Sequence, residues 1–243
     1  MDYLEEQQNY WDGFADEYYT IQQESFTTIA EDVAKYLLES QCLPCGLFVD
    51  LAGGYGKYLP AIAPYVNNYL LVDFSANMLN KAKSIHPNKN IQYIQSDQET
   101  FCANSIPQQY DLVFSAMNPS LHTLQQLQSL LRMAKKQLIL IQILEDVDTV
   151  FTPLETLLLN QMQRPVPFKS FKKWLAKEDL PWVSKTFSYQ KEEVITKQFV
   201  NDYFEQEQQQ EQRLTEEIET LFLNGSLIKN THKITFELLR ILK

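Results

Sequence analysis

The stretch Asp50-Leu51-Ala52-Gly53-Gly54-Tyr55-Gly56 holds three of the chain's 6 glycines within four positions, directly after the apolar run Leu47-Phe48-Val49. Glycine accepts positive φ and has no Cβ, so a strand that ends in such a cluster turns tightly and its backbone can touch a bound molecule. A second apolar run, Tyr69-Leu70-Leu71-Val72, ends in Asp73. This carboxylate comes about 20 residues after the first turn, where a second parallel strand presents an acid to a ribose diol. Together the two segments predict a nucleoside pocket.

The spacing of the glycines indicates which nucleoside is bound. No register of the cluster gives the dinucleotide pattern G-x-G-x-x-G, because its last position falls on Lys57 or Leu59. NAD and FAD are therefore disfavoured. The spacing Asp-x-Ala-x-Gly-x-Gly instead resembles the first motif of class I S-adenosylmethionine (SAM)-dependent methyltransferases, with an alanine in place of the usual first glycine. The resemblance implies that this loop wraps the methionine part of SAM, with contacts from Asp50, Ala52, Gly53, Gly54 and Gly56.

The second motif of the same family resembles the segment that follows the second apolar run. Asp73 is followed by Phe74, by Ser75 as the expected cap of a helix, and by Met78. The resemblance implies that Asp73 binds the ribose hydroxyls and that Phe74 and Met78 pack on the adenine.

Two further strand ends fit the family in order. Asp97 and Gln98 end a third strand that begins at Ile91, and the resemblance implies that they face the adenine amino group and the ring. The fourth strand, 110–117, is expected to pass beneath the methyl donor at Ser115 and Ala116. Read singly, an aspartate at a strand end is also an ordinary turn residue, because it hydrogen-bonds its own backbone there.

An aromatic segment at residues 10–19 resembles the N-terminal lid that closes over the cofactor in many small-molecule methyltransferases. Tyr10 and Tyr18 are the cofactor contacts that this resemblance implies. The aromatic residues also fall at helical spacing, and such a stripe is typical of core packing.

The order of apolar segments predicts an α/β, doubly wound, Rossmann-like, seven-stranded and mostly parallel sheet with an antiparallel last strand. We expect one methyltransferase domain over 1–243, divided into four parts. These are an N-terminal helical lid (1–42), a cofactor-binding core (43–144), a helical acceptor-lid insertion before the sixth strand (145–180) and C-terminal strands and a helix (181–243). Within the last part we expect a strand at 182–189, a long helix at 192–222 and a strand at 232–242.

The acceptor site is expected where the insertion meets the carboxyl ends of the strands, since open α/β sheets bind ligands there. Asn118 follows the fourth strand, and the insertion brings Phe168, Phe171 and Trp174. His122 is the candidate general base, needed only for an acceptor that must lose a proton; otherwise it is a residue at the start of a helix.

Composition limits the partners. The net charge of −10 disfavours nucleic acid, whose binding depends on Lys and Arg. No run reaches the roughly 18 apolar residues of a membrane span, so we expect a cytoplasmic protein, monomeric or homodimeric, without nucleic-acid or membrane partners. Its 3 cysteines and 3 histidines lack metal-ligand spacing, and no metal is expected.

The sequence therefore favours SAM-dependent methyl transfer to a small-molecule acceptor, with S-adenosylhomocysteine (SAH) as product. Two alternatives stay open. One is an enzyme of the same fold that uses SAM for chemistry other than methylation, and the other is a non-catalytic SAM-binding module.

Overall fold

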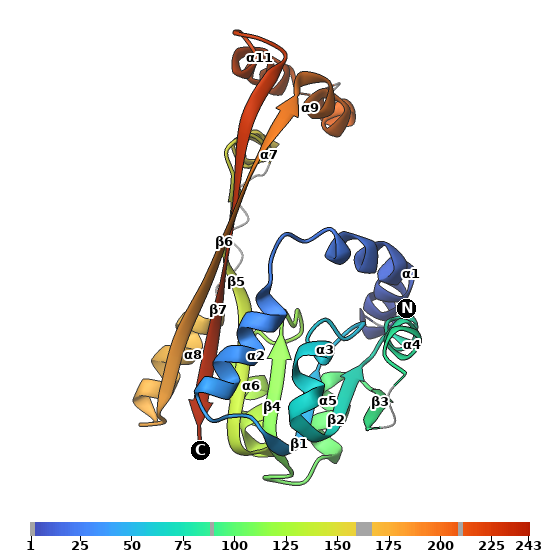
Figure 1. Ribbon diagram of the computed structural model, residues 1–243, viewed down its shortest axis with the longest axis vertical. Coiled ribbons are helices and arrows are strands. Elements are labelled where there is room, and N and C mark those ends of the chain that lie inside the picture. Colours follow the sequence, from blue (N-terminus) through green and yellow to red (C-terminus); the bar gives the residue numbers. More distant parts are fainter. Residues whose placement is uncertain (1–2, 88–89, 159–166, 209–210) are drawn as a thin grey trace. The chain divides into compact units, whose positions relative to one another are not determined.

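A computed structural model describes residues 3–87, 90–158, 167–208 and 211–243. Its strands form a 7-stranded sheet in the order β3-β2-β1-β4-β5-β7-β6 (Figure 1). The strands are β1 (Cys45–Leu51), β2 (Val66–Asp73), β3 (Ile91–Gln95), β4 (Tyr110–Ala116), β5 (Ala134–Asp148), β6 (Trp182–Thr196) and β7 (Leu227–Leu242). The helices are α1 (Tyr3–Gln23), α2 (Ile29–Glu39), α3 (Leu59–Ile62), η1 (Ala63–Tyr65), α4 (Ala76–Ile85), α5 (Gln98–Asn104), α6 (Leu124–Met133), α7 (Phe151–Leu158), α8 (Pro167–Lys177), α9 (Lys197–Tyr203), α10 (Glu205–Gln208) and α11 (Gln212–Leu221).

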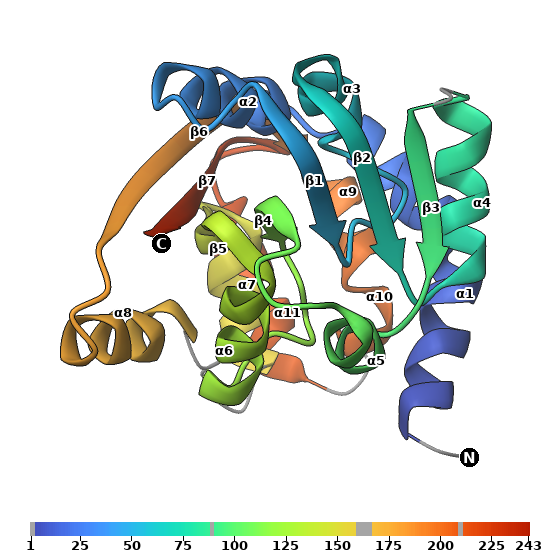
Figure 2. The same cartoon turned by 90° about the horizontal axis from the view of Figure 1, so that it is seen from below.

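Strands β1 to β5 pair with one another in parallel, and the strand order reverses between β1 and β4. The arrowheads of β1, β2 and β3 point to the same edge in Figure 2, and β7 runs opposite to β4 in Figure 1. The predicted fold class, a doubly wound and mostly parallel seven-stranded sheet, is confirmed. A crevice at the carboxyl ends of the strands, where the order reverses, is the place where such sheets bind ligands.

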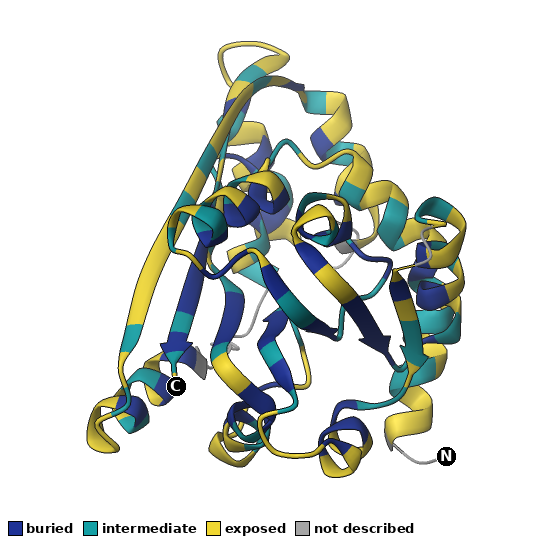
Figure 3. Cartoon of the chain, turned by 60° about the horizontal axis from the view of Figure 1, so that its bottom comes forward, coloured by how far each residue is buried: buried dark blue, intermediate teal, exposed yellow. Residues whose placement is uncertain are grey.

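The central strands are apolar because parallel strands are covered on both faces. Leu70, Leu71 and Val72 of β2 are all buried, as are Val49 and Leu51 of β1. Figure 3 shows the buried residues concentrated on the central strands, whereas β6 and the outer turns of the helices are largely exposed.

Contacts between Cα atoms divide the chain into two compact units. Unit 1 comprises Met1–Gln142, Val166–Phe187 and Glu237–Lys243, and unit 2 comprises Ile143–Pro165 and Ser188–Phe236. Strands β5, β6 and β7 contribute residues to both units. Of the two helices in the predicted insertion, α7 belongs to unit 2 and α8 to unit 1.

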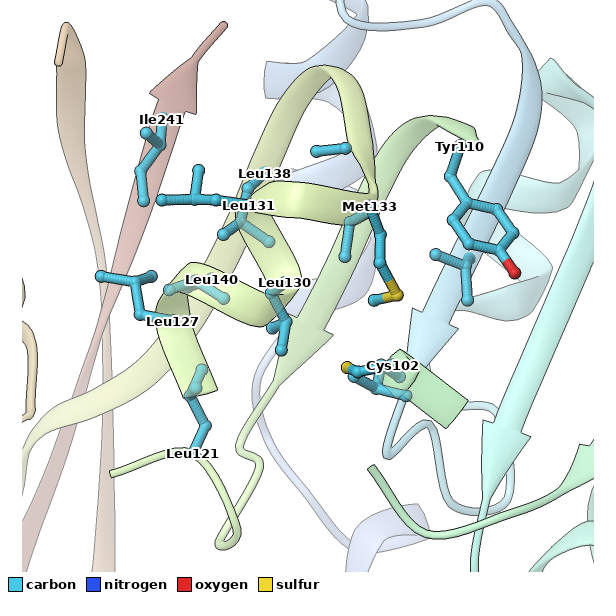
Figure 4. Close-up of a cluster of buried hydrophobic side chains, with 14 of the residues drawn as sticks. Cys102, Tyr110, Leu121, Leu127, Leu130, Leu131, Met133, Leu138, Leu140 and Ile241 are labelled. Atoms are coloured by element: carbon cyan, nitrogen blue, oxygen red, sulfur yellow. The ribbon is translucent and has the colours of Figure 1, made fainter. Parts of the chain in front are cut away.

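One core of unit 1 lies between the sheet and helices α6 and α8. Leu127, Leu130 and Leu131 of α6 project toward Leu138 of β5 and Ile241 of β7 (Figure 4). Helix α6 begins with a capping box, in which the Thr123 hydroxyl accepts from the backbone N–H of Gln126 at 3.2 Å. This cap fixes the start of the helix close to the end of β4.

Unit 2 has a small core of its own, formed by one face each of α7, α9 and α11. The buried members are Val150, Leu154, Ile195, Val200, Phe204, Leu214, Ile218 and Phe222. Asn230 of β7 is 1% exposed, and its Oδ1 accepts from the backbone N–H groups of Thr149 and Val150. This amide ties β7 to the start of α7.

Several predicted boundaries differ from the structure. The long helix expected over 192–222 is wrong: residues up to Thr196 continue β6, and the described residues that follow form the shorter helices α9, α10 and α11. The alternation of Glu193, Val194 and Ile195 fits a strand, and the Thr196 hydroxyl caps α9 by accepting from the backbone N–H of Phe199. Among the described residues, no helix has both the length and the apolar character to cross a membrane.

Candidate functional site

The glycine loop follows β1 and is held against β2. The backbone N–H of Gly53 donates to the carbonyl of Val72 at 3.1 Å, and a Cβ on Gly53 would lie 2.9 Å from Oδ2 of Asp50. Gly54 has φ +57 and open space at its missing Cβ, with Met78 Sδ the nearest atom at 3.9 Å. Gly53 is therefore required for packing, whereas Gly54 keeps the loop backbone accessible.

Ala52 adopts φ 58, in the left-handed region that glycine usually occupies. This position is the one where the family motif has its first glycine and this chain has alanine. A left-handed alanine costs roughly 1 kcal/mol or more, so the surrounding loop holds Ala52 in a strained conformation.

Asp73 ends β2 and is 6% exposed. Its Oδ2 accepts from the backbone N–H of Gly54 at 2.9 Å, and its Oδ1 accepts from the backbone N–H of Ser75 at 2.9 Å. Burial raises the pKa of this carboxyl, while the N–H groups of Ser75 and Gly54 oppose the rise. The backbone N–H of Phe74 also acts on this carboxylate. A carboxylate has about four acceptor sites, so acceptor capacity remains after these bonds.

Asp50 lies beneath the loop and is 1% exposed. Its Oδ2 accepts from the Tyr69 hydroxyl at 2.7 Å. Burial raises its pKa to about 7, the hydrogen bond from Tyr69 acts against the rise, and the charge on Asp73 adds to it. The structure therefore places Asp50 as a support for the loop, without an exposed surface for a ligand.

Helix α4 starts beside Asp73. Ser75 is its N-cap as predicted, because the hydroxyl accepts from the backbone N–H of Met78 at 3.1 Å. Met78 is 2% exposed and packs with Tyr55 and Ala15, whereas Phe74 is half-buried.

Helix α1 packs on α4 and on the glycine loop. The ring of Tyr18 lies 6.0 Å from that of Tyr55, and burial and the charge of Asp73 raise the Tyr18 pKa. Asp12 fixes the helix: its Oδ1 accepts from the Ser75 hydroxyl at 2.5 Å and from the Asn77 backbone N–H at 3.0 Å. The aromatic segment thus packs over the loop.

Tyr10 does not belong to the residues that pack around Tyr55 and Met78. It is 58% exposed, and its ring lies near Trp11 and Phe14 of the same helix. The structure thus brings Tyr18 to the site and leaves Tyr10 on the surface.

Asp97 and Gln98 begin α5. Oδ1 of Asp97 accepts from the Thr100 backbone N–H at 2.9 Å, so Asp97 is a helix cap. Its burial would raise the pKa of the carboxyl, but this bond and the neighbouring backbone N–H groups lower it overall. Gln98 is 9% exposed, and its Oε1 accepts from Nδ2 of Asn118 at 2.8 Å.

The end of β4 joins this group. The Ser115 hydroxyl donates to the carbonyl of Leu51 at 2.9 Å and accepts from Asn118 Nδ2 at 2.9 Å. Ala116 is half-buried, and Met117, at φ 53, begins the turn that follows the strand. Ser115 and Asn118 therefore link the ends of β1, β4 and the start of α5.

His122 is exposed and borders a cleft of about 770 Å³ between α5 and α6. Gln98, Glu99 and Arg132 line the same cleft. The His122 backbone N–H donates to Oε1 of Gln126 at 3.1 Å, which ties the residue to the start of α6.

The aromatic residues expected in the acceptor site are placed differently by the structure. Phe168 is 4% and Phe171 0% exposed, and both belong to the core between α6, α8 and the sheet. Trp174 is partly buried against the same core. Because the apolar face of α8 packs on α6 and the sheet, we do not assign Phe168, Phe171 or Trp174 to the acceptor site.

Three features of the site were not predicted from the sequence. They are the hydrogen bonds to Asp12, the hydrogen bond from Tyr69 to Asp50, and the hydrogen bonds from Asn118 to Gln98 and Ser115. Asp12 and Asp16 stand four apart on α1, and Asp16 pairs with Lys81 of α4 at 2.6 Å. That i, i+4 spacing marks a polar face beside the aromatic one, but it does not identify the helix that the face contacts. Among the described residues, no group of three or more His, Cys, Asp or Glu is arranged to hold a metal ion.

Residues 48–138 match the sequence profile of a family described as a methyltransferase domain. No curated protein sequence matches the chain. This match covers the glycine loop and the ends of β2, β3 and β4, so it includes most of the predicted cofactor residues.

Solved structures share the fold. Magnesium protoporphyrin IX methyltransferase from Synechocystis PCC 6803 with bound SAH has a TM-score of 0.57 at 14% identity, covering 97% of this chain and 98% of that one. The YcgJ protein from Bacillus subtilis has a TM-score of 0.55 at 15% identity, covering 86% and 97%. These structures and this chain share the Rossmann-like fold of class I methyltransferases, as the sequence predicts.

Proposed function

We propose that this methyltransferase domain transfers a methyl group from SAM to a small-molecule acceptor by in-line displacement. One observation carries the proposal: Asp73 Oδ2 lies 2.9 Å from the backbone nitrogen of Gly54, so a ribose-binding acid and an open glycine loop form one site. The bound SAM found in relatives of the same fold supports the same cofactor here, since the Synechocystis enzyme is also known with SAM bound.

The residues present fit this cofactor. Asp73 keeps acceptor sites for a ribose diol, Gly54 leaves space above the loop, and Gln98 supplies a buried amide N–H group. Phe74 borders the same end of β2 and offers a ring to an adenine face. We propose that the further wall of this pocket is formed by predicted cofactor residues that keep exposed surface, namely Tyr18, Ala52, Gly53, Asp97 and Ala116, and that the buried Gly56, Met78 and Ser115 support it as Asp50 does, while Tyr10 stays on the surface.

When bound, SAM supplies a sulfonium methyl that is already electrophilic, so the protein has to position the nucleophile and exclude water. Helix α1 excludes water, because Tyr18 and Tyr55 cover the loop and Asp12 holds the helix on α4. His122 is proposed to accept a proton from the acceptor when methylation requires it, from its place on the cleft beside Gln98.

The acceptor is proposed to be small. The net charge of −10 opposes a nucleic-acid backbone, and small-molecule enzymes occur among the structures of the same fold. We propose that the enzyme is a monomer or a homodimer and that it is cytoplasmic.

Calorimetric titration with SAM, SAH and NAD tests the cofactor. We expect binding of SAM and SAH and none of NAD; binding of NAD without SAM or SAH would overturn the proposal. Incubation with methyl-labelled SAM and a metabolite extract then tests the reaction. A labelled product formed in the same amount as SAH supports methyl transfer. Consumption of SAM without transfer of the label supports other SAM chemistry. Tight binding of SAM without turnover supports a binding module.

A variant separates the acceptor side from the cofactor side. His122→Ala should keep SAH affinity within about threefold and lower turnover at least tenfold, the pattern of a residue that deprotonates the nucleophile. Gln125→Ala, on the rim of the same cleft, is the matched control. Equal turnover in both variants would remove His122 from the mechanism.

A further inference from the structure

Helix α9 exposes two aromatic side chains on the surface of unit 2. Phe199 and Tyr203 are each 54% exposed, whereas Val200 and Phe204 of the same helix are buried in the core of this unit. Because Phe199 and Tyr203 stand four residues apart, they lie on one side of the helix. Exposed aromatic side chains that gather on one surface mark a site of interaction.

A third ring joins these two side chains into one surface. The ring centre of Phe151, the first residue of α7, lies 6.0 Å from that of Phe199 and 5.0 Å from that of Tyr203, edge to face in both pairs. Phe151 also packs against the core of unit 2, so it holds the two exposed rings in place. We call Phe151, Phe199 and Tyr203 the aromatic surface of unit 2.

Two carboxylates stand beside the aromatic surface. Oε1 of Glu155, one turn after Phe151 on α7, accepts from the Tyr203 hydroxyl at 2.9 Å. Asp202, which precedes Tyr203 on α9, is exposed, and its Oδ1 accepts from the neutral amide of Gln198 at 2.6 Å. In the part of the chain that the structure describes, neither Glu155 nor Asp202 forms an ion pair. Both carboxylates therefore keep their negative charge beside the rings.

The lysines of unit 2 pair with other acidic residues. They form ion pairs on the strands and between α9 and α11: Lys191 with Glu193, Lys197 with Glu219, Lys229 with Glu192 and Lys233 with Glu145. Acidic residues outnumber basic ones in this unit. The described lysines thus leave the carboxylates beside the aromatic surface to a cation from outside the chain.

The negative charge favours one kind of partner for this surface. Anionic lipids and nucleic acid are repelled by carboxylates. A second copy of the chain, docked around a two-fold axis, would set the same carboxylates against each other, and like charges across an interface oppose association. An arginine side chain, in contrast, stacks on the face of an aromatic ring and pairs with a carboxylate at its edge.

We propose that the aromatic surface of unit 2 docks an extended, arginine-rich segment of a partner protein. Side chains four residues apart on a helix, such as Phe199 and Tyr203, are about 5–6 Å apart at Cβ. Alternate side chains of an extended chain point to the same side and are about 6.6 Å apart. Alternating arginines would therefore place one guanidinium over each ring, beside Glu155 and Asp202. This docking goes beyond methyl transfer and does not depend on it.

Fluorescence anisotropy of a labelled peptide of alternating arginine and serine, titrated with the full chain, tests the docking. We expect this peptide to bind and a peptide of alternating glutamate and serine not to bind. Phe199→Leu keeps an apolar side chain but removes the ring, and it should weaken binding about fivefold. Asp202→Asn should weaken binding by a similar factor, and the double variant at least tenfold.

Two substitutions elsewhere on unit 2 are the matched controls. Val194→Ser removes a side chain of β6 that is 65% exposed, and Glu217→Gln removes an exposed charge of α11. Each should keep the affinity for the arginine peptide within about twofold. Because all four side chains are exposed, the variants should fold, and thermal melting verifies this.

Several outcomes would overturn the proposal. Wild type that does not bind the arginine peptide has no such docking surface. Equal losses in Asp202→Asn and Glu217→Gln, with none in Phe199→Leu, would reduce the binding to unspecific attraction between charges. Free arginine amide that competes as well as the peptide would assign the surface to a small cation. A molar mass in light scattering, or binding to anionic phospholipid vesicles, that is lost in Phe199→Leu would assign it to a second copy or to a membrane.

Discussion

Replacing Asp73 by asparagine perturbs the centre of the site without changing its shape. Both carboxylate oxygens accept a backbone N–H, from Gly54 and from Ser75, at 2.9 Å each. An asparagine has one oxygen, so its NH₂ group must face one of these N–H donors. A buried donor left unpaired costs roughly 1–3 kcal/mol, and relief of the buried charge offsets part of this cost. We therefore expect the free energy of unfolding to fall by about 1–2 kcal/mol.

The loss of SAH affinity should be larger than this. Hydrogen bonds to a charged group contribute roughly 1.5–3 kcal/mol, so Asp73→Asn should weaken SAH binding about ten- to a hundredfold in calorimetry. Asp111→Asn is the matched control, because Asp111 Oδ2 also accepts two backbone N–H groups, from Gly46 and Leu47, but lies near the start of β4, at the opposite end of that strand from the site. The 2′-deoxy form of SAH should bind wild type more weakly than SAH and bind Asp73→Asn with the same affinity as SAH. A variant at Asp73 that keeps SAH affinity within threefold would refute this assignment of the ribose site.

Four further predictions follow from the same contacts. Burial raises the pKa of Asp50 from 3.8 to about 7. The protonated carboxyl therefore contributes fully to the free energy of unfolding below about pH 4, and this contribution is lost as the pH rises to 7. The urea midpoint of wild type should fall over this pH range, and that of Asp50→Asn should fall less. Ala52→Val should lower stability by about 1–2 kcal/mol in chemical denaturation, because a branched residue resists φ 58, whereas Ala52→Gly should stay within about 1 kcal/mol. Phe171→Ala should cost about 3–5 kcal/mol of stability and leave the SAH affinity of the folded protein unchanged, as expected of a core residue. Asp12→Ala should speed hydrogen exchange across α1, because Asp12 accepts hydrogen bonds from Ser75 and Asn77. Asp16→Ala should not, because the Asp16 side chain is 90% exposed. Equal exchange in both variants would show that the aromatic contacts alone hold the helix.

The placement of the glycine loop beside Asp73 was predictable because its signals are local. One apolar strand runs into residues 50–56, and another ends at Asp73. Each strand places the residues at its end on the carboxyl edge of a parallel sheet, and this placement does not depend on the rest of the chain. The Ser75 cap was predictable for the same reason, since a cap depends on the next three residues only. These features need only the periodicity of the apolar runs and the chemistry of the residue that follows each run.

The rest depended on long-range packing that the sequence does not encode locally. Phe168, Phe171 and Leu175 form an apolar stripe on α8, which predicts that one face is buried but not that it packs on α6 instead of on a ligand. The Asp12 bonds to α4 and the Asn118 bond to Gln98 join residues 63 and 20 positions apart. Neither pairing has a spacing rule, because both follow from the crossing of elements in the finished fold.

The placement of α8 in the core also changes what the acceptor site is expected to recognise. With Phe168 and Phe171 buried, α8 presents neither ring to a flat apolar acceptor. The described groups next to Gln98 are those of the cleft between α5 and α6, where His122, Glu99 and Arg132 offer hydrogen-bond donors and acceptors. Because a site built from such groups rejects ligands that leave them unpaired, we expect a polar acceptor that pairs with them. In the screen with methyl-labelled SAM, label in polar metabolites would support this expectation, and label confined to the apolar fraction would contradict it.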